Sequence, residues 1–291
     1  MKACKTRRSG LPPGMASRGM APFSLDQRAV APEEDLNESS GLSTKDILWQ
    51  NIVSEYSNLN LTYPCPDRLA ALAGVAERMA ADSRSEYVAG LWKKELPRTL
   101  LWRVFSTPGT PRERFSEMYV APTWSWVSVD GGVELPEILS DTNEEFARIV
   151  EVEVNAVDGM EKFGQIASAK LTLEGCLMPA TWNTKPSPLT DIEFPVGIEG
   201  HDVTVYSTER PYTQLARCVF DCGSAVLADQ ANVKALAAME PERILRYVWS
   251  ILVEPHGAST KEFVRLGVWF ARSGGVKDHT EKGQKKIIML L

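Results

Sequence analysis

The chain has 291 residues, of which 44% are hydrophobic and 24% charged, so it is long enough and apolar enough to fold around a substantial core. Its formal net charge of −6 gives no basic field for nucleic acid or anionic lipid, and no apolar run approaches the ~18 residues that a membrane helix needs. The five cysteines are odd in number and widely scattered, which favours reduced thiols in the cytoplasm over a disulfide framework.

Residues 1–42 are predicted to be a poorly ordered leader. Five basic residues precede the first acidic residue there, and periodic apolar residues are missing, so the segment buries too little surface to offset its ordering entropy. An Arg- and Ser-rich, acid-poor leader is also typical of a mitochondrial transit peptide. Pro12, Pro13 and Gly14 would interrupt the amphipathic helix that a transit peptide needs, which favours a solvated tail.

Two helices are predicted to follow and to supply a short helical layer over residues 43–100. Ser43 or Thr44 can cap the first helix, and Asp46 suits its first turn. The apolar residues of this helix recur at helical spacing, at Leu48, Trp49, Ile52, Val53 and Tyr56. A Pro-Cys-Pro segment is expected to end it, and a second helix is expected to begin at Asp67. One side of that second helix carries Leu69, Leu72, Val75 and Met79.

The stretch Tyr87–Pro136 holds four of the eight tryptophans. Tryptophan buries more area than any other side chain, so this clustering predicts the centre of the core. At the start of the stretch, Tyr87–Trp92 is predicted to be a short helix. Leu100–Val104 is too short for its periodicity to distinguish a strand from a helix.

The Trp-Ser-Trp segment of the same stretch is predicted to be a strand. Alternation would place Trp124 and Trp126 on one face and Ser125 and Val127 on the other. The Asp-Gly-Gly sequence that begins at Asp130 is predicted to be a turn.

From about residue 146 the apolar pattern has a period of two, which predicts strands. The expected strands are Ile149–Val157, Lys170–Glu174, Asp202–Tyr206, Ala216–Asp221, Tyr247–Val253, Phe263–Phe270 and Lys286–Leu291. The Ala-rich segment Val226–Met239 has a helical composition. Residues 43–291 are therefore predicted to be one α+β domain, in which the helical layer packs on an antiparallel β sandwich or barrel over residues 100–291.

Four segments carry a resemblance to a known family. The sequences YVAGLWKKELPRTLLW and APTWSWVSVDG resemble the "YLAGLW…LLW…APSWSWASVDG" pattern found downstream of the signalling domain in fungal heterokaryon-incompatibility (HET) proteins. IVSEYSNLNLTYPCPDRLAALAGVA and ILVEPHGASTKEFVRLGVW are similar to flanking patterns of the same family. The resemblance covers about residues 45–135 strongly and 245–270 weakly. It implies a free-standing C-terminal module of this family.

The signalling motifs of HET proteins, "SYVWG" and "WIDALCINQ", have no counterpart in this sequence. The family's role in self/non-self recognition and cell death is attributed to that signalling part. The resemblance therefore implies either a module with a separate use or a truncated, non-functional incompatibility protein.

Motifs for common chemistries are absent from the sequence. The three histidines fall in no metal-ligand spacing, and Cys218 and Cys222 lack a matching second pair of ligands. The sequence has no GxGxxG, GxxxxGK[ST] or GxSxG motif for a nucleotide or a nucleophile elbow. Neither a metal nor a cofactor is predicted.

Three functions remain open on these grounds. The first is a binding module that takes an apolar small molecule or a protein partner. The second is a cofactor-independent cyclase or isomerase, for example one that promotes an intramolecular Diels–Alder reaction of a fungal terpenoid or polyketide by holding a reactive conformer and polarising a carbonyl. The third is the non-functional fragment.

Candidate site residues follow from the second hypothesis. The expected pocket walls are Tyr87, Trp92, Trp102, Trp124 and Trp126, for which plain core packing is the alternative. The polar candidates for orienting or activating a substrate are Arg103, Asp130 and His201. A structural ion pair is the alternative for Arg103, a turn for Asp130 and a satisfied histidine for His201.

Overall fold

A computed structural model describes most of the chain beyond the leader. The described residues are 44–59, 61, 63–82, 85–104, 114–115, 118–136, 144–157, 163–182, 193–197, 216–221, 234–240, 247–272 and 284–291. The predictions for the leader 1–42 and for the strand Asp202–Tyr206 lie outside these residues.

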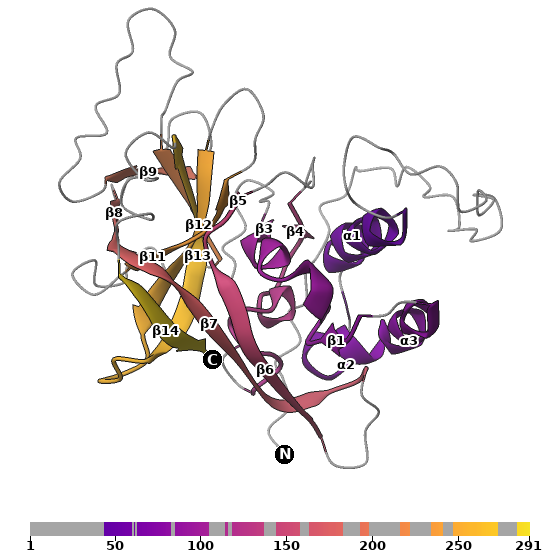
Figure 1. The fold of residues 1–291 in the computed structure, drawn as a ribbon. Coiled ribbons are helices and arrows are strands. Elements are labelled where there is room, and N and C mark those ends of the chain that lie inside the picture. The colour runs from indigo at the N-terminus through magenta and orange to yellow at the C-terminus, as the bar shows by residue number, and fades with distance from the viewer. Residues whose placement is uncertain are drawn as a thin grey trace, which may run out of the picture.

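Helices dominate the first part of the described chain, and strands dominate the rest (Figure 1). The α-helices are α1 (Thr44–Ser57), α2 (Pro64–Ala70) and α3 (Ala73–Asp82), and the short 3-10 turns are η1 (Lys93–Glu95), η2 (Arg98–Leu101) and η3 (Trp126–Ser128). The short strands are β1 (Tyr87–Val88), β2 (Leu91–Trp92), β3 (Arg103–Val104), β4 (Val133–Glu134), β5 (Glu144–Glu145), β8 (Thr181–Trp182), β9 (Glu193–Gly197) and β10 (Ala216–Phe220). The longer strands are β6 (Arg148–Ala156), β7 (Ile166–Pro179), β11 (Lys234–Glu240), β12 (Tyr247–Pro255), β13 (Glu262–Arg272) and β14 (Lys285–Leu290).

Five strands close into a barrel in the order β12-β11-β7-β14-β13, because β13 also pairs with β12. The pairings are antiparallel except that of β13 with β14, which run parallel over two residue pairs, Glu262 with Met289 and Phe263 with Leu290. β6 lies beside β7, and β10, β9 and β8 continue the sheet from β13. The structure thus shows a strand-rich chain with three short α-helices and a five-stranded barrel.

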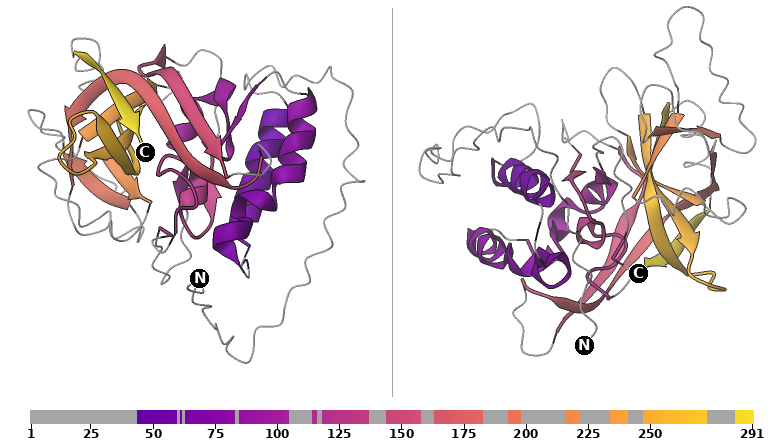
Figure 2. Two further views of the ribbon diagram at one scale, coloured as in Figure 1. Left: turned by 90° about the horizontal axis from the view of Figure 1, so that it is seen from below. Right: turned by 180° about the vertical axis from the view of Figure 1, so that it is seen from behind.

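The segment between the helices and the long strands lies between the two in space. Figures 1 and 2 show α1, α2 and α3 on one side, the barrel on the other, and the elements from β1 to β4 between them. One hydrophobic core runs through all three parts, and includes Trp49 of α1, Trp126 of η3 and Leu173 of β7. The Trp-rich stretch is therefore the centre of the core, as its composition predicts.

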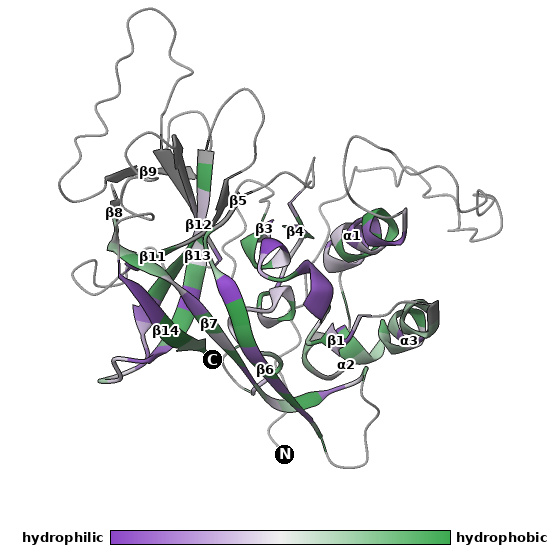
Figure 3. Cartoon of the chain, viewed as in Figure 1, coloured by the Kyte–Doolittle hydropathy of each residue, from purple (hydrophilic) through white to green (hydrophobic). Residues whose placement is uncertain are grey.

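The period-two pattern predicts several long strands correctly. β6 alternates between hydrophilic and hydrophobic residues (Figure 3), and β12, β13 and β14 coincide closely with the predicted segments. The predicted strand Lys170–Glu174 is the middle of the much longer β7. Gly175 lies in β7 where a Cβ atom would stand 2.6 Å from Leu236 Cδ1, so the absence of a side chain lets β11 pack close to β7.

Three predicted elements are wrong. Tyr87–Trp92 is not a helix but a hairpin, in which Ala89 and Gly90 turn the chain with φ of 50° and 91°. The Trp-Ser-Trp segment is not a strand. It enters η3, and all four of its side chains from Trp124 to Val127 are fully buried rather than divided between two faces. The described part of Val226–Met239 is β11, where pairing with β12 and β7 overrides the helical propensity of alanine.

The helical layer also differs from the prediction in detail. The second predicted helix is two helices, and the first of them begins at Pro64 rather than Asp67, since proline is tolerated in a first turn. Leu48 and Val75 are exposed instead of facing the core. Among the described residues, no helix combines the length and apolar character that crossing a membrane requires.

Candidate functional site

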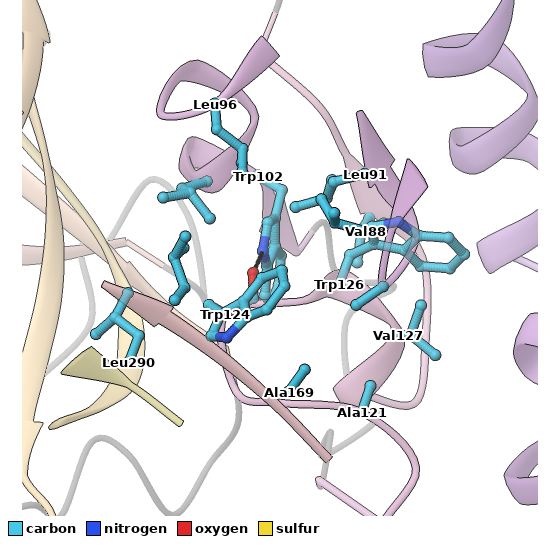
Figure 4. Packing of buried hydrophobic residues seen from close by; sticks show 14 of the residues in the cluster. Val88, Leu91, Leu96, Trp102, Ala121, Trp124, Trp126, Val127, Ala169 and Leu290 are labelled. Atoms are coloured by element: carbon cyan, nitrogen blue, oxygen red, sulfur yellow. Dashed lines mark hydrogen bonds between the residues drawn. The ribbon is translucent and has the colours of Figure 1, made fainter. Parts of the chain in front are cut away.

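Three of the predicted pocket residues are internal parts of the core. No surface of Trp102, Trp124 or Trp126 is accessible to water, and Figure 4 shows Trp124 on the barrel side, toward Leu290, and Trp126 on the helical side. Trp102 Nε1 donates a hydrogen bond to the carbonyl oxygen of Trp124 at 2.8 Å, and Trp126 Nε1 donates to that of Gly90 at 2.9 Å. Packing and these two hydrogen bonds give Trp102 and Trp126 a structural role in the core.

The other two predicted pocket residues, Tyr87 and Trp92, belong to the same core and form a group of ring contacts with Trp49 and Phe163. We call these four residues the aromatic cluster. The ring centroids of Trp49 and Tyr87 are 5.8 Å apart, those of Tyr87 and Trp92 5.3 Å, and those of Tyr87 and Phe163 5.4 Å. Trp49 meets both Tyr87 and Trp92 edge to face, which contributes about 0.5–1.5 kcal/mol per pair beyond burial.

Three distant segments build the aromatic cluster. Tyr87 and Trp92 are paired in register across the β1–β2 hairpin, so both side chains extend from the same face. Trp49 comes from the buried side of α1, and Phe163 lies three residues before the start of β7. Phe163 is the one member of the cluster that is only partly buried.

The aromatic cluster contains two polar atoms that the fold leaves unused. Trp49 Nε1 and the Tyr87 hydroxyl are buried, and neither has a hydrogen-bond partner among the described residues. The two side chains are only 2% and 4% exposed. Burial raises the pKa of Tyr87, so its hydroxyl stays a neutral donor. An unsatisfied buried donor costs about 1–3 kcal/mol, and an acceptor oxygen within hydrogen-bond distance would remove this cost.

Charged residues stand at the edge of this region. Lys94 Nζ contacts Asp46 Oδ1 at 2.9 Å and Glu95 Oε1 at 3.7 Å. Asp46 lies one turn before Trp49 in α1, and Lys94 and Glu95 follow Trp92 in η1. Burial raises the pKa of Glu95, and the negative charge of Asp46 raises it further, while Lys94 opposes both. Two carboxylates therefore share one ammonium group at this edge.

The raised pKa of Glu95 predicts a pH dependence of stability. A carboxyl that binds its proton more tightly in the folded state contributes stability that is fully present below its unfolded pKa of about 4.5 and is lost as the pH rises through the folded pKa. We therefore expect Glu95→Gln to gain stability relative to the wild type as the pH rises from about 4 to about 7. Urea unfolding at a series of pH values measures this, with Glu86→Gln at the exposed pair with Lys93 as the control. A constant difference between Glu95→Gln and wild type would contradict it.

The predicted polar residues are not gathered at the aromatic cluster. Arg103 forms a cross-strand ion pair with Glu134, with Nη2 2.9 Å from Oε2, and both side chains are partly exposed. Asp130 is 67% exposed and stands 4.0 Å from Arg68 Nη1, next to Gly131, whose φ is 128°. His201 lies outside the described residues. Structural roles thus account for Arg103 and Asp130.

Sequence reasoning missed a buried ionic group, which consists of Arg114, Asp221 and Arg265. The Asp221 carboxylate accepts from Arg265 Nε at 2.9 Å and Nη2 at 3.0 Å, and from Arg114 Nη2 at 2.6 Å. Asp221 and Arg265 are 1% exposed or less in their side chains. The one available signal was an arginine in the otherwise apolar run FVRLGVWF.

This ionic group ties the barrel to the Trp-rich stretch. Arg265 donates to the carbonyl oxygens of Leu100 and Trp102, and its guanidinium carbon lies 3.6 Å from the centre of the Trp102 ring. Arg114 donates to Ser128 Oγ and to the carbonyl oxygen of Thr123. Both guanidinium groups thus donate to acceptors within the protein. We call Arg114, Asp221 and Arg265 together the structural clamp.

A metal site is not evident in the part of the chain that the structure describes, since no three His, Cys, Asp or Glu side chains gather there.

Comparison with known proteins does not identify a family for this chain. No protein-family model matches the chain, and no curated protein and no solved structure shows significant similarity to it.

Proposed function

We propose that this chain is a binding protein for a neutral, largely apolar small molecule that carries an oxygen acceptor, and that the aromatic cluster holds this molecule. The observation that supports the proposal is the pair of buried donors, Trp49 Nε1 and the Tyr87 hydroxyl, without partners among the described residues. Aromatic walls with a few convergent polar groups are typical of small-molecule sites. The HET resemblance, with its implication of a free-standing C-terminal module, remains part of this proposal.

Both donors are neutral, and this decides the class of ligand. A buried carboxylate or phosphate would need a cation beside it, because an unpaired ion is far more costly to bury than a neutral carbonyl. Lys94, the cation at the edge, is already paired with Asp46 and Glu95. A ketone, ester or ether oxygen therefore suits the pair best.

The substitution Tyr87→Phe tests the proposal. It removes an unsatisfied hydroxyl, so we expect the melting temperature of the free protein to stay the same or rise. Binding of prodan, a neutral naphthyl ketone whose emission reports hydrogen bonding at its carbonyl, is expected to weaken about tenfold. Tyr56→Phe is the matched control, because the Tyr56 hydroxyl donates to the carbonyl oxygen of Asp67. Equal prodan binding by wild type and Tyr87→Phe would overturn the proposal.

The same donors favour a second candidate function, the cofactor-independent cyclase or isomerase. Two hydrogen bonds to one carbonyl withdraw electron density from a conjugated system and would accelerate a cycloaddition of a bound, folded substrate. Incubation with a mixture of fungal terpenoid and polyketide metabolites, followed by native mass spectrometry and product profiling, separates the two functions. A retained, unchanged compound supports binding alone, and a new isomer of equal mass supports catalysis.

A further inference from the structure

The adjacent barrel strands β12 and β13 are buried on both faces. Ile251 and Val253 of β12, together with Val268 of β13, belong to the main core. Side chains alternate along a strand, so Ser250 and Trp269 extend from the opposite face. Both are completely buried. A second buried layer thus lies on the other side of these strands.

Ser250 and Trp269 are neighbours in this second layer. They are directly opposite each other in the antiparallel register of β12 and β13, which brings their Cβ atoms to about 4.5–5.5 Å. Two residues away on the same face are Leu252 and Gly267, which are also paired. Gly267 contributes no side chain, so another group can approach the backbone closely beside Trp269.

Neither polar atom of this pair is satisfied. Ser250 Oγ and Trp269 Nε1 have no hydrogen-bond partner in the described part of the protein. In the Trp-rich stretch, Ser125 Oγ donates to the carbonyl oxygen of Ala89 and Trp126 Nε1 donates to that of Gly90, whereas Trp124 Nε1 lacks a partner among the described residues. Two adjacent donors without acceptors, on one apolar face, point to an acceptor that comes from outside the chain.

We propose that Ser250 and Trp269 form a second buried ligand subsite, which takes the carbonyl or ether oxygen of a neutral apolar molecule. The pair is neutral, so an anion would be buried there without a compensating cation. Arg265, which lies four residues from Trp269 in β13, already forms two hydrogen bonds with Asp221. This proposal goes beyond the function assigned to the aromatic cluster, because no residue is shared between the two sites.

The test uses the full chain with the aromatic cluster disabled by Trp49→Phe and Tyr87→Phe. In this background, Ser250→Ala removes a donor that makes no hydrogen bond, so the melting temperature is expected to stay the same or rise. Trp269→Phe also removes an unsatisfied donor but leaves a cavity, so it is expected to lower the melting temperature less than Trp126→Phe, which loses the same volume together with a satisfied donor. Ser125→Ala removes a satisfied donor and is expected to lower the melting temperature. Prodan binding to the background protein is expected to weaken about fivefold to tenfold with Trp269→Phe, and the emission of the bound dye to shift to the blue.

Two results would overturn the subsite. One is a melting temperature that falls as far in Ser250→Ala and Trp269→Phe as in the two controls, since these donors would then be satisfied within the protein. The other is prodan binding to the background protein that is absent, or unchanged by both substitutions. Because the background lacks the donors of the aromatic cluster, neither result depends on the function proposed for that cluster.

Discussion

Replacing Asp221 with alanine is expected to lower the free energy of unfolding by about 3–5 kcal/mol, because two buried guanidinium groups lose their common counterion. Arg265 is fully buried and Arg114 partly buried, and neither has another carboxylate among its hydrogen-bond partners in the described residues. The substitution would destabilise the Trp-rich stretch as well, since Arg265 also donates to the carbonyl oxygens of Leu100 and Trp102.

Urea unfolding, followed by tryptophan fluorescence, measures this effect. Asp221→Asn keeps the shape and removes only the charge, and we expect it to cost nearly as much as Asp221→Ala. The matched control is Glu134→Gln, which breaks the exposed pair with Arg103 and should cost less than about 1 kcal/mol. Similar losses for Asp221→Asn and Glu134→Gln would mean that the clamp does not hold the barrel to the Trp-rich stretch.

The second large effect is expected for Gly90→Ala, at about 3 kcal/mol or more. Gly90 has a φ of 91°, which L side chains rarely adopt, and an added Cβ atom would lie 2.8 Å from Trp126 Nε1 and 2.9 Å from Val127 Cγ2. The strain of the backbone accounts for about 1 kcal/mol, and the displacement of a packed indole in the core for the rest. The hydrogen bond from Trp126 to the Gly90 carbonyl would be disturbed as well.

Gly257→Ala separates the two contributions. Gly257 also has a positive φ, 60°, but no atom lies within 4 Å of the position that its Cβ would occupy. Thermal or urea unfolding of the two variants should therefore show a loss of about 1 kcal/mol for Gly257→Ala and a clearly larger one for Gly90→Ala. Equal losses would show that the close packing of Trp126 on the hairpin contributes little.

The strands were predictable where one face of a strand meets water. β6 alternates valines with glutamates at Glu151 and Glu153, and this pattern is local in the sequence. The hairpin and η3 were not predictable, because contacts between distant residues form them. Ser125 Oγ both donates to the Ala89 carbonyl oxygen and accepts from Val127 N, so the chain turns at Ser125 instead of continuing as a strand.

The candidate site was predictable only in part. Tyr87 and Trp92 could be found because aromatic residues are concentrated in their segment, but Trp49 and Phe163 join them from α1 and from the segment before β7. The sequence does not indicate which donors lack a hydrogen-bond partner, because this depends on where carbonyl groups from distant parts of the chain lie in the folded protein. Asp221 and Arg265 are 44 residues apart and were hidden for the same reason.

The indole N–H signals of the tryptophans test the central claim most directly. A nitrogen–proton correlation NMR spectrum of the ¹⁵N-labelled protein, recorded with and without prodan, reports the hydrogen bonding of each indole, and Trp49→Phe assigns the Trp49 signal. We predict a downfield proton shift of the Trp49 signal on binding, with little change for Trp102 and Trp126, whose N–H groups already donate to carbonyl oxygens. Prodan binding without any shift of the Trp49 signal would contradict the proposed site.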